Sequence, residues 1–296
     1  MNYSNRIALP KPFYAFALLG YLCLGCTSGL PTGSAGSAAT TPATAQPPTA
    51  PTPEAFSKLV WSDEFDSPSL DTTKWEMEVG DKWHNNELQA YTNSAANAFT
   101  KDGLLVIEAK KEQLREAGYT SARLRTKGKG DWQFGKIEVR AKLPSGQGIW
   151  PAIWMMPTDD VYGGWPKSGE LDIMELRGKT PNQVLGTIHY GTTWPGNKNI
   201  SGEFDLPTGT FSDDFHIFSI TWSKDLIRWY VDGQQFYEVT PATIAPEHYP
   251  YNSRFYLILN LAVGGDFGGN PDSTTTFPQQ MLVDYARVYK LPEEDS

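Results

Sequence analysis

From Phe56 onward, apolar and polar residues alternate in short runs, and the three- to four-residue spacing of an amphipathic helix is scarce. In the run from Ile137 to Leu143, for example, Ile, Val, Ala and Leu alternate with Glu, Arg and Lys. This period of two is typical of a strand that turns one face to a core. We therefore expect a domain built of strands, without long helices.

Three further segments indicate strands. Residues 227–239 hold the Asp232-Gly233 pair between two β-rich flanks, which predicts a hairpin with a tight turn. Residues 255–263 are apolar almost throughout, as in a strand buried on both faces, and residues 281–289 predict a closing strand. A domain of about 240 residues with many Gly and Pro turns and no alternation of strands with helices predicts two antiparallel sheets packed as a sandwich.

The first 25 residues have the organisation of an export signal. Residues 1–12 carry Arg6 and Lys11 and no acid, and residues 13–25 are uncharged and mostly apolar. A helix of that apolar length would cover roughly 20 Å, too short for a hydrocarbon core of ~30 Å, which favours a cleaved signal over a membrane anchor or a buried helix.

The end of this segment, Leu24-Gly25-Cys26, resembles a bacterial lipobox, in which the cysteine becomes the lipidated first residue of the mature protein. Cys23 stands where that motif prefers Leu, so an ordinary secretory signal is the alternative. We expect an exported protein, either an outer-membrane lipoprotein that contacts the membrane only through lipid on Cys26, or a periplasmic or extracellular protein.

Residues 27–53 are Thr, Ser, Gly, Ala or Pro at every position except Leu30 and Gln46, and they carry no charge. Such a segment cannot bury enough apolar surface to offset the entropy of ordering it. We therefore predict a signal peptide at 1–25, a disordered tether at 26–55, the β-sandwich domain at 56–291 and a short tail at 292–296.

The chain has 25 Lys and Arg against 34 Asp and Glu, a formal net charge of −9. A nucleic-acid partner is not expected, because phosphate neutralisation needs clustered cations and the only basic stretch is Lys127-Gly128-Lys129. Both cysteines, Cys23 and Cys26, precede the domain, so its body can form neither a disulfide framework nor a Cys/His metal site.

The most informative segment contains three acids, Glu170, Asp172 and Glu175. Glu170 and Asp172 are two apart and share a face of a strand, whereas Glu175 is an odd number away and would point to the opposite face. A β-bulge at Ile173-Met174 restores the parity and puts all three acids on one surface.

Three carboxylates on one face repel one another and do not stabilise the fold. Such a cluster is useful in catalysis when one carboxyl is ionised, another is protonated, and the third shifts the pKa values of both. Glycoside hydrolysis needs such a pair, one carboxylate to attack the anomeric carbon and one acid to protonate the leaving oxygen. The alternatives are a solvated acidic face and a Ca²⁺ site. Nearby Trp150, Trp154 and Trp165 weaken both alternatives, because indole rings stack on the apolar faces of sugars.

With these residues in view, the sequence resembles glycoside hydrolase family 16 and, within it, the laminarinase-like endo-1,3-β-glucanases. The shared segments are Trp-His-Asn-Asn-Glu-Leu-Gln at 83–89, Gly-Ile-Trp-Pro-Ala-Ile-Trp at 148–154, Glu-Leu-Asp-Ile-Met-Glu at 170–175, Gly-Thr-Ile-His-Tyr-Gly at 186–191 and Asn-Leu-Ala-Val-Gly-Gly at 260–265. The resemblance implies a β-jelly-roll sandwich with a concave cleft. It also implies a retaining enzyme with Glu170 as nucleophile, Asp172 as its modulator and Glu175 as general acid/base.

The same resemblance implies further site residues. Those expected to touch glucan are Asn86, Arg123, Trp150, Trp154, Trp165 and His189, although a structural hydrogen bond is an alternative role for His189. A structural Ca²⁺ is implied at Glu64, the Gly103 carbonyl and Asp284, with a metal-free surface carboxylate as the alternative. No cofactor is expected for catalysis, and we expect a monomer. Residues 157–165 depart most from the family pattern and could reshape one end of the cleft.

The expected substrate is a laminarin-type β-1,3-glucan cleaved at internal bonds. Mixed-linkage glucan, or an algal galactan such as agar or carrageenan, is the alternative substrate, and a non-catalytic β-glucan-binding protein is the alternative class. Sulfated galactans would favour cationic subsites, which the acidic charge disfavours. A binding protein would have no need of all three acids.

Overall fold

The computed structural model describes residues 58–290. The predicted signal peptide, tether, Cys26 and tail lie outside these residues, as do the outermost residues of the predicted domain. Within 58–290, no helix has the length and apolar character needed to cross a bilayer.

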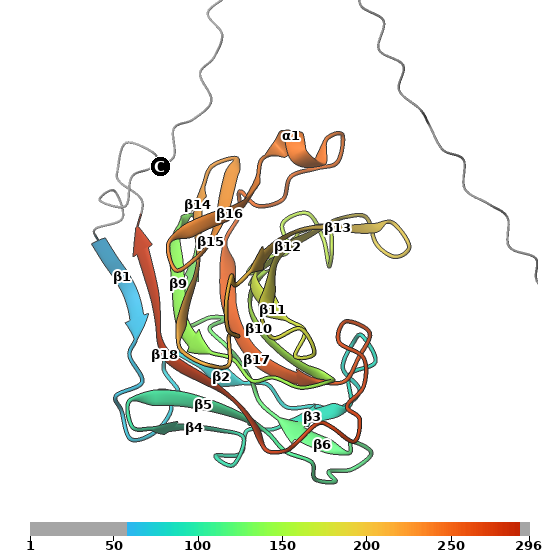
Figure 1. The fold of residues 1–296 in the computed structure, drawn as a ribbon. Coiled ribbons are helices and arrows are strands. Elements are labelled where there is room, and N and C mark those ends of the chain that lie inside the picture. The colour runs from blue at the N-terminus through green and yellow to red at the C-terminus, as the bar shows by residue number, and fades with distance from the viewer. Residues whose placement is uncertain (1–57, 291–296) are drawn as a thin grey trace, which may run out of the picture. The chain divides into compact units, whose positions relative to one another are not determined.

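Two antiparallel sheets of eight strands each pack face to face (Figure 1), which confirms the predicted sandwich. We call the first the outer sheet. Its strands are β1 (Lys58–Asp63), β4 (Ala98–Lys101), β5 (Leu104–Ala109), β9 (Gly135–Lys142), β14 (His216–Ser223), β15 (Leu226–Val231), β16 (Gln234–Val239) and β18 (Gln279–Lys290). They run in the order β16-β15-β14-β9-β18-β5-β4, and β1 pairs with β18.

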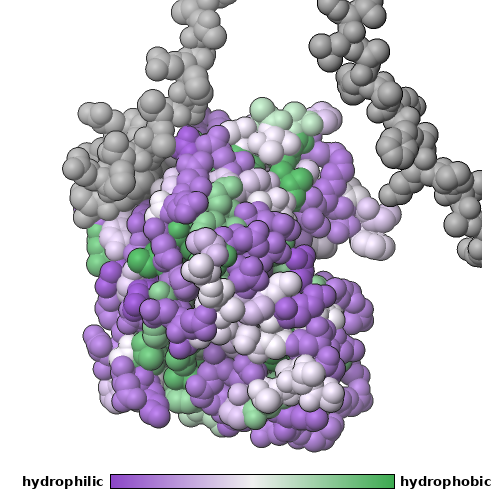
Figure 2. All heavy atoms as spheres, in the orientation of Figure 1, coloured by the Kyte–Doolittle hydropathy of each residue, from purple (hydrophilic) through white to green (hydrophobic). Residues whose placement is uncertain are grey.

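We call the second the cleft sheet. Its strands are β2 (Glu76–Met77), β7 (Arg123–Arg125), β8 (Asp131–Trp132), β10 (Ile149–Pro157), β11 (Glu170–Leu176), β12 (Gln183–Gly191), β13 (Asn197–Asp205) and β17 (Phe255–Val263). Their order is β13-β12-β11-β10-β17-β7-β2, and β8 pairs with β17. Strands β10 to β13 curve around an open space at the right of Figure 1, and Figure 2 shows the surface hollowed there.

Two small elements complete the described chain. Strands β3 (Gln89–Tyr91) and β6 (Tyr119–Ser121) form a parallel pair, and α1 (Pro241–Ile244) is the one helix within residues 58–290.

The core lies between the two large sheets, and the predicted strands supply much of it. In β9, Ile137, Val139 and Ala141 are fully buried, while every residue of β17 is buried. The predicted hairpin is β15–β16, and both turn residues, Asp232 and Gly233, have positive φ (49° and 80°), as a tight primed turn requires. The closing strand is β18, slightly longer than predicted.

Candidate active site

Strand β11 carries the three acids, and the predicted bulge is present. Asp172 pairs with Thr187 on β12 and Glu175 pairs with Leu185, so two residues of β11 lie opposite one of β12. The side chains of Leu171, Ile173, Met174 and Leu176 belong to the buried core. Because the extra residue corrects the parity, the core keeps its apolar side chains while Glu170, Asp172 and Glu175 share the cleft face.

A tryptophan of the outer sheet supports the bulge from behind. Trp229 on β15 is fully buried and donates a hydrogen bond from Nε1 to the carbonyl oxygen of Asp172 (2.8 Å). Its ring lies against Gly186 on β12, where an added Cβ would come within 2.4 Å of it. The glycine therefore gives the indole room to reach the strand that carries the acids.

Each outer carboxylate accepts a hydrogen bond from an indole. Trp165 donates from Nε1 to Glu170 (2.5 Å), and Trp150 donates to Glu175 (3.1 Å). His189 Nε2 lies between the first two acids, 3.2 Å from Asp172 Oδ2 and 3.7 Å from Glu170 Oε1. Three of the residues expected to touch substrate are thus in direct contact with the acids.

Arg123 and Trp154 form a second group on the same sheet. The guanidinium of Arg123 lies over the rings of Trp83 and Trp154, 4.9 and 4.6 Å from their centroids, and its Nε is 2.5 Å from Glu78. Trp154 donates to Asn260 on β17 (2.6 Å). This packing fixes the guanidinium while side-chain exposure of 17% leaves it open to the cleft.

Asn86, in the segment before β3, is held by Asp266, whose carboxylate accepts from Nδ2 at 3.0 Å. The loop after β17 that carries Asp266 also carries Phe267, whose ring lies 4.9 Å from that of Trp150. The six residues expected to touch glucan therefore come from three strands, β7, β10 and β12, and from two loops.

The pairing register aligns these residues in rows across the strands. One row runs from Arg123 on β7 through Asn260, Ala152, Glu175 and Leu185. A neighbouring row contains Trp154, Asp172 and Thr187. The site is thus elongated at right angles to the strands, as a groove for a linear chain would be.

Burial and mutual repulsion shift the ionisation of the cluster. Burial first, and the charge of Asp172 second, raise the pKa of Glu170 to about 7 and that of Glu175 to about 8. Burial acts in the opposite sense on His189, but its hydrogen bond to Asp172 and the charges of Glu170, Asp172 and Glu175 outweigh that effect and raise its pKa to about 10. At neutral pH the cluster therefore holds an imidazolium and a protonated Glu175.

The comparisons agree with this geometry. The model of the glycosyl hydrolases family 16 matches residues 84–287, which include all three acids. The chain belongs to glycosyl hydrolases family 16.

Several relatives of this family are close in sequence or structure. The chain is 44% identical to a beta-glucanase of Rhodothermus marinus over 80% of its own length and 86% of that protein. It is 46% identical to glucan endo-1,3-beta-glucosidase A1 of Niallia circulans over 78% of its length, but spans only 38% of that longer protein. The laminarinase catalytic domain of Thermotoga maritima superposes with a TM-score of 0.74 at 45% identity, covering 79% of this chain and 98% of that one. The sandwich is thus the family 16 jelly roll.

One group in the cleft has the composition of a metal site. Glu170, Asp172 and His189 offer ligand atoms that lie within 4.8 Å of one another. The raised pKa of His189 keeps a proton on each ring nitrogen at neutral pH, so a metal ion would have to displace one of these protons to bind. The cluster therefore fits proton chemistry better than metal binding.

The residues implied for a structural Ca²⁺ have other partners in this structure. Glu64 accepts from Arg287 at 2.7 and 3.0 Å, and Asp284 accepts from Arg140 at 2.6 Å. Gly103 has φ of 76°, the left-handed region. Because an arginine already neutralises each carboxylate, a cation there would have to share or displace these pairs, and the calcium site stays a prediction.

Some functional contacts were not predicted from the sequence. Asn260, Trp83, Phe267 and Trp229 each touch a predicted site residue, yet none was predicted as one, although Trp83 and Asn260 begin two of the shared segments. Asn260 could have been found, because it is the one polar residue in the apolar run 255–263. Phe267 and Trp229 have no such signal, since only the pairing of distant strands brings them to the site.

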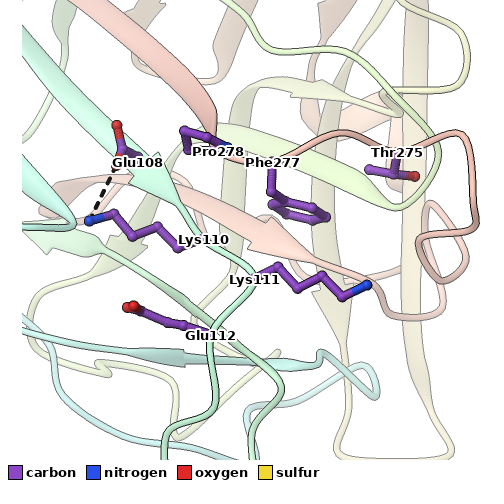
Figure 3. A pocket seen from close by; sticks show the side chains of 7 residues that line it. All are labelled: Glu108, Lys110, Lys111, Glu112, Thr275, Phe277 and Pro278. Atoms are coloured by element: carbon purple, nitrogen blue, oxygen red, sulfur yellow. Dashed lines mark ion pairs between the residues drawn. The ribbon is translucent and has the colours of Figure 1, made fainter.

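A depression of about 420 Å³ shares no residue with this cleft (Figure 3). Lys110 pairs with Glu108 at 3.3 Å on one side of it, and the Phe277 ring lies on the other. Its remaining lining residues are Lys111, Glu112, Thr275 and Pro278. The two acids that line this depression, Glu108 and Glu112, do not lie together on one strand as the three acids of β11 do.

Proposed function

We propose that this family 16 protein is a retaining endo-1,3-β-glucanase that cleaves internal bonds of laminarin-type glucans. The observation that carries the proposal is the row of three carboxylates on bulged β11, with an indole hydrogen-bonded to each outer acid. The names of the relatives, glucan endo-1,3-beta-glucosidase and laminarinase, support β-1,3-glucan as the substrate.

In the first step, Glu175 gives its proton to the glycosidic oxygen while a carboxylate oxygen of Glu170 attacks the anomeric carbon. The carbon–oxygen bond breaks, one glucan fragment leaves with a new hydroxyl, and the other remains as a glycosyl ester of Glu170. In the second step, the Glu175 carboxylate takes a proton from water as the water oxygen attacks the same carbon. The ester breaks, both acids return to their starting states, and two inversions retain the configuration.

The electrostatics support this division of roles. Burial and the charge of Asp172 raise the pKa of Glu175, so this group can hold a proton at neutral pH, as a general acid must. The ionised form of Glu170 is stabilised by the hydrogen bond from the Trp165 indole and by the neighbouring His189 cation. Asp172 contacts that cation and places a charge beside both glutamates, so it adjusts their pKa values without being a reacting group.

The substrate is tested with a reducing-sugar assay on laminarin, lichenan, agarose and carrageenan. Laminarin should be hydrolysed fastest, and Glu170→Ala should abolish the activity because no other group can form the ester. Activity of that variant within about tenfold of the parent would contradict the assignment of the nucleophile. Proton NMR of the first product should show the β-anomer, and an α-anomer would exclude retention.

We also propose, from the sequence alone, that the protein is exported and lipidated on Cys26, and that Glu64, the Gly103 carbonyl and Asp284 bind a structural Ca²⁺. The apolar segment at 13–25 and the Leu-Gly-Cys ending support the first proposal. The family resemblance at Glu64, Gly103 and Asp284 supports the second.

A further inference from the structure

Large apolar side chains that are strongly exposed gather at one end of the strands of the cleft sheet. Of eight such residues within 58–290, three lie between β10 and β11 and one lies between β12 and β13. They are Val161, Tyr162, Trp165 and Trp194. Because adjacent strands of this sheet are antiparallel, the β10–β11 and β12–β13 connections lie at the same end of the strands, where β11 begins at Glu170.

Trp194 is the most exposed of these side chains, at 81%. It lies in the β12–β13 hairpin, whose turn is fixed by backbone bonds between Thr192 and Gly196 (3.1 Å) and between Gly196 and Thr193 (2.9 Å). Within residues 58–290 its indole has neither a hydrogen-bond partner nor a stacked ring. A single exposed apolar side chain is common, but four of them at one end of the cleft strands, Trp194 among them, indicate a surface that binds a ligand.

Next to this hairpin, β13 extends the cleft face with small polar side chains. The register places Asn199 opposite His189, Ser201 opposite Thr187 and Glu203 opposite Leu185. The hydroxyls of Thr187 and Ser201 lie 2.9 Å apart, which shows that this row of β13 shares the face of β12 that carries His189.

The other face of β13 packs towards the core. Ile200 and Phe204 are partly buried against it, and the Phe204 ring lies 5.7 Å from Phe236 of the outer sheet. The polar row is therefore held in place on the cleft side, where Asn199, Ser201 and Glu203 are exposed and present hydrogen-bonding groups to solvent.

The spacing between strands gives the distance of this surface from the three acids. Strand β13 lies two inter-strand spacings, or about 10 Å, from β11. A chain bound across the strands would pass from the Arg123 side over β11 and β12 to β13, where Asn199 lies in the row of Glu170 and Ser201 in the row of Asp172. The proposed groove thus extends beyond the acids on the side opposite Arg123.

We propose that β13 and the Trp194 hairpin form a distal glucan subsite, in which Asn199 and Ser201 hydrogen-bond sugar hydroxyls and Trp194, in the turn of the same hairpin, stacks on a sugar ring of the bound chain. This inference rests on the proposed function, since it assumes a β-1,3-glucan that lies across the strands. Only chains long enough to reach β13 gain from the contact, so the subsite would favour polymer over short oligosaccharides.

The test compares Trp194→Ala, Trp194→Phe and the parent on laminarin and on β-1,3-gluco-oligosaccharides of increasing length. For laminarin, Trp194→Ala should raise KM about three- to tenfold, the loss expected for one aromatic stacking contact. Trp194→Phe should recover most of it, and the shortest cleaved oligosaccharides should react equally with all three proteins. The matched control is Leu59→Ala, an exposed residue of β1 in the outer sheet, which should change nothing.

An end-labelled oligosaccharide gives a second readout, because loss of a distal subsite should shift which internal bond is cut. Equal KM values and cleavage positions for Trp194→Ala and the parent would refute the subsite while leaving the glucanase function intact. A loss that is equal at all lengths and accompanied by a lower Tm would assign Trp194 a structural role and also refute it. If the parent cleaves no β-1,3-glucan, both the function and the subsite are wrong.

Discussion

Replacing Asp172 with Asn should shift the pH dependence of hydrolysis to lower pH. Asp172 is 2% exposed, and its charge is the second cause, after burial, of the raised pKa of both Glu170 and Glu175. Asparagine keeps the shape and removes the charge. The pKa of Glu170 and that of Glu175 should then both fall. The acidic limb of the pH profile, set by the nucleophile, and the basic limb, set by the general acid, should therefore both move to lower pH.

The structure sets the size of this shift. Ligand atoms of Glu170 and Asp172 lie within 4.8 Å of each other, and we take the same scale for Glu175, because the charge of Asp172 is likewise the second cause of its raised pKa. Two unit charges at that distance repel by about 3.5 kcal/mol at an effective dielectric of 20 and by about 0.9 kcal/mol in water, which corresponds to roughly 2.5 and 0.6 pKa units. A shift of about one unit is therefore expected.

The assay is the pH profile of kcat/KM on laminarin, which reports the free enzyme. If the pKa of Glu175 falls by about one unit from about 8, its protonated fraction at pH 8 falls from about one half to about one tenth, a roughly fivefold loss. Because the carboxyls interact, each limb of the pH profile reports a pKa of the whole cluster and not of one residue. The displacement of the two limbs between the variant and the parent is therefore the quantity to measure. Glu116→Gln, an exposed carboxylate paired with Lys82, is the control. An unmoved or upward-shifted profile for Asp172→Asn would refute the reasoning.

Three further predictions test the support of the site, the metal and the anchor. Trp229→Phe leaves the Asp172 carbonyl without its buried donor and should lower the free energy of unfolding by about 1–3 kcal/mol in urea titrations; an unchanged midpoint would show that the bond does not support the bulge. If Glu64, Gly103 and Asp284 bind calcium, Ca²⁺ should raise Tm and EDTA should lower it, and Glu64→Ala should remove both effects; a Tm insensitive to Ca²⁺ contradicts the site. A palmitate analogue should label the protein in cells and Cys26→Ser should abolish the label; persistent labelling excludes lipidation at Cys26.

The three acids show how far sequence reasoning reaches into the site. Glu175 stands at an odd spacing from Glu170, so a regular strand would bury one charge in the core. Because burying an unpaired carboxylate costs several kcal/mol, a bulge was the consistent solution, and the structure contains it. The partners of these acids could not be derived in the same way. Trp229 is 57 positions from Asp172, and Asn260 is 106 positions from Trp154.

The sequence by itself determined the strands, the sandwich class and the three acids, because alternation and spacing along one strand are local properties. The tertiary structure decided what surrounds them. It placed His189 between Glu170 and Asp172, set an indole on each outer glutamate, and left Trp194 exposed beyond the cleft. The physical reason is that pKa values and groove length depend on the registers between strands. Those registers are fixed only when the whole sandwich closes on its core.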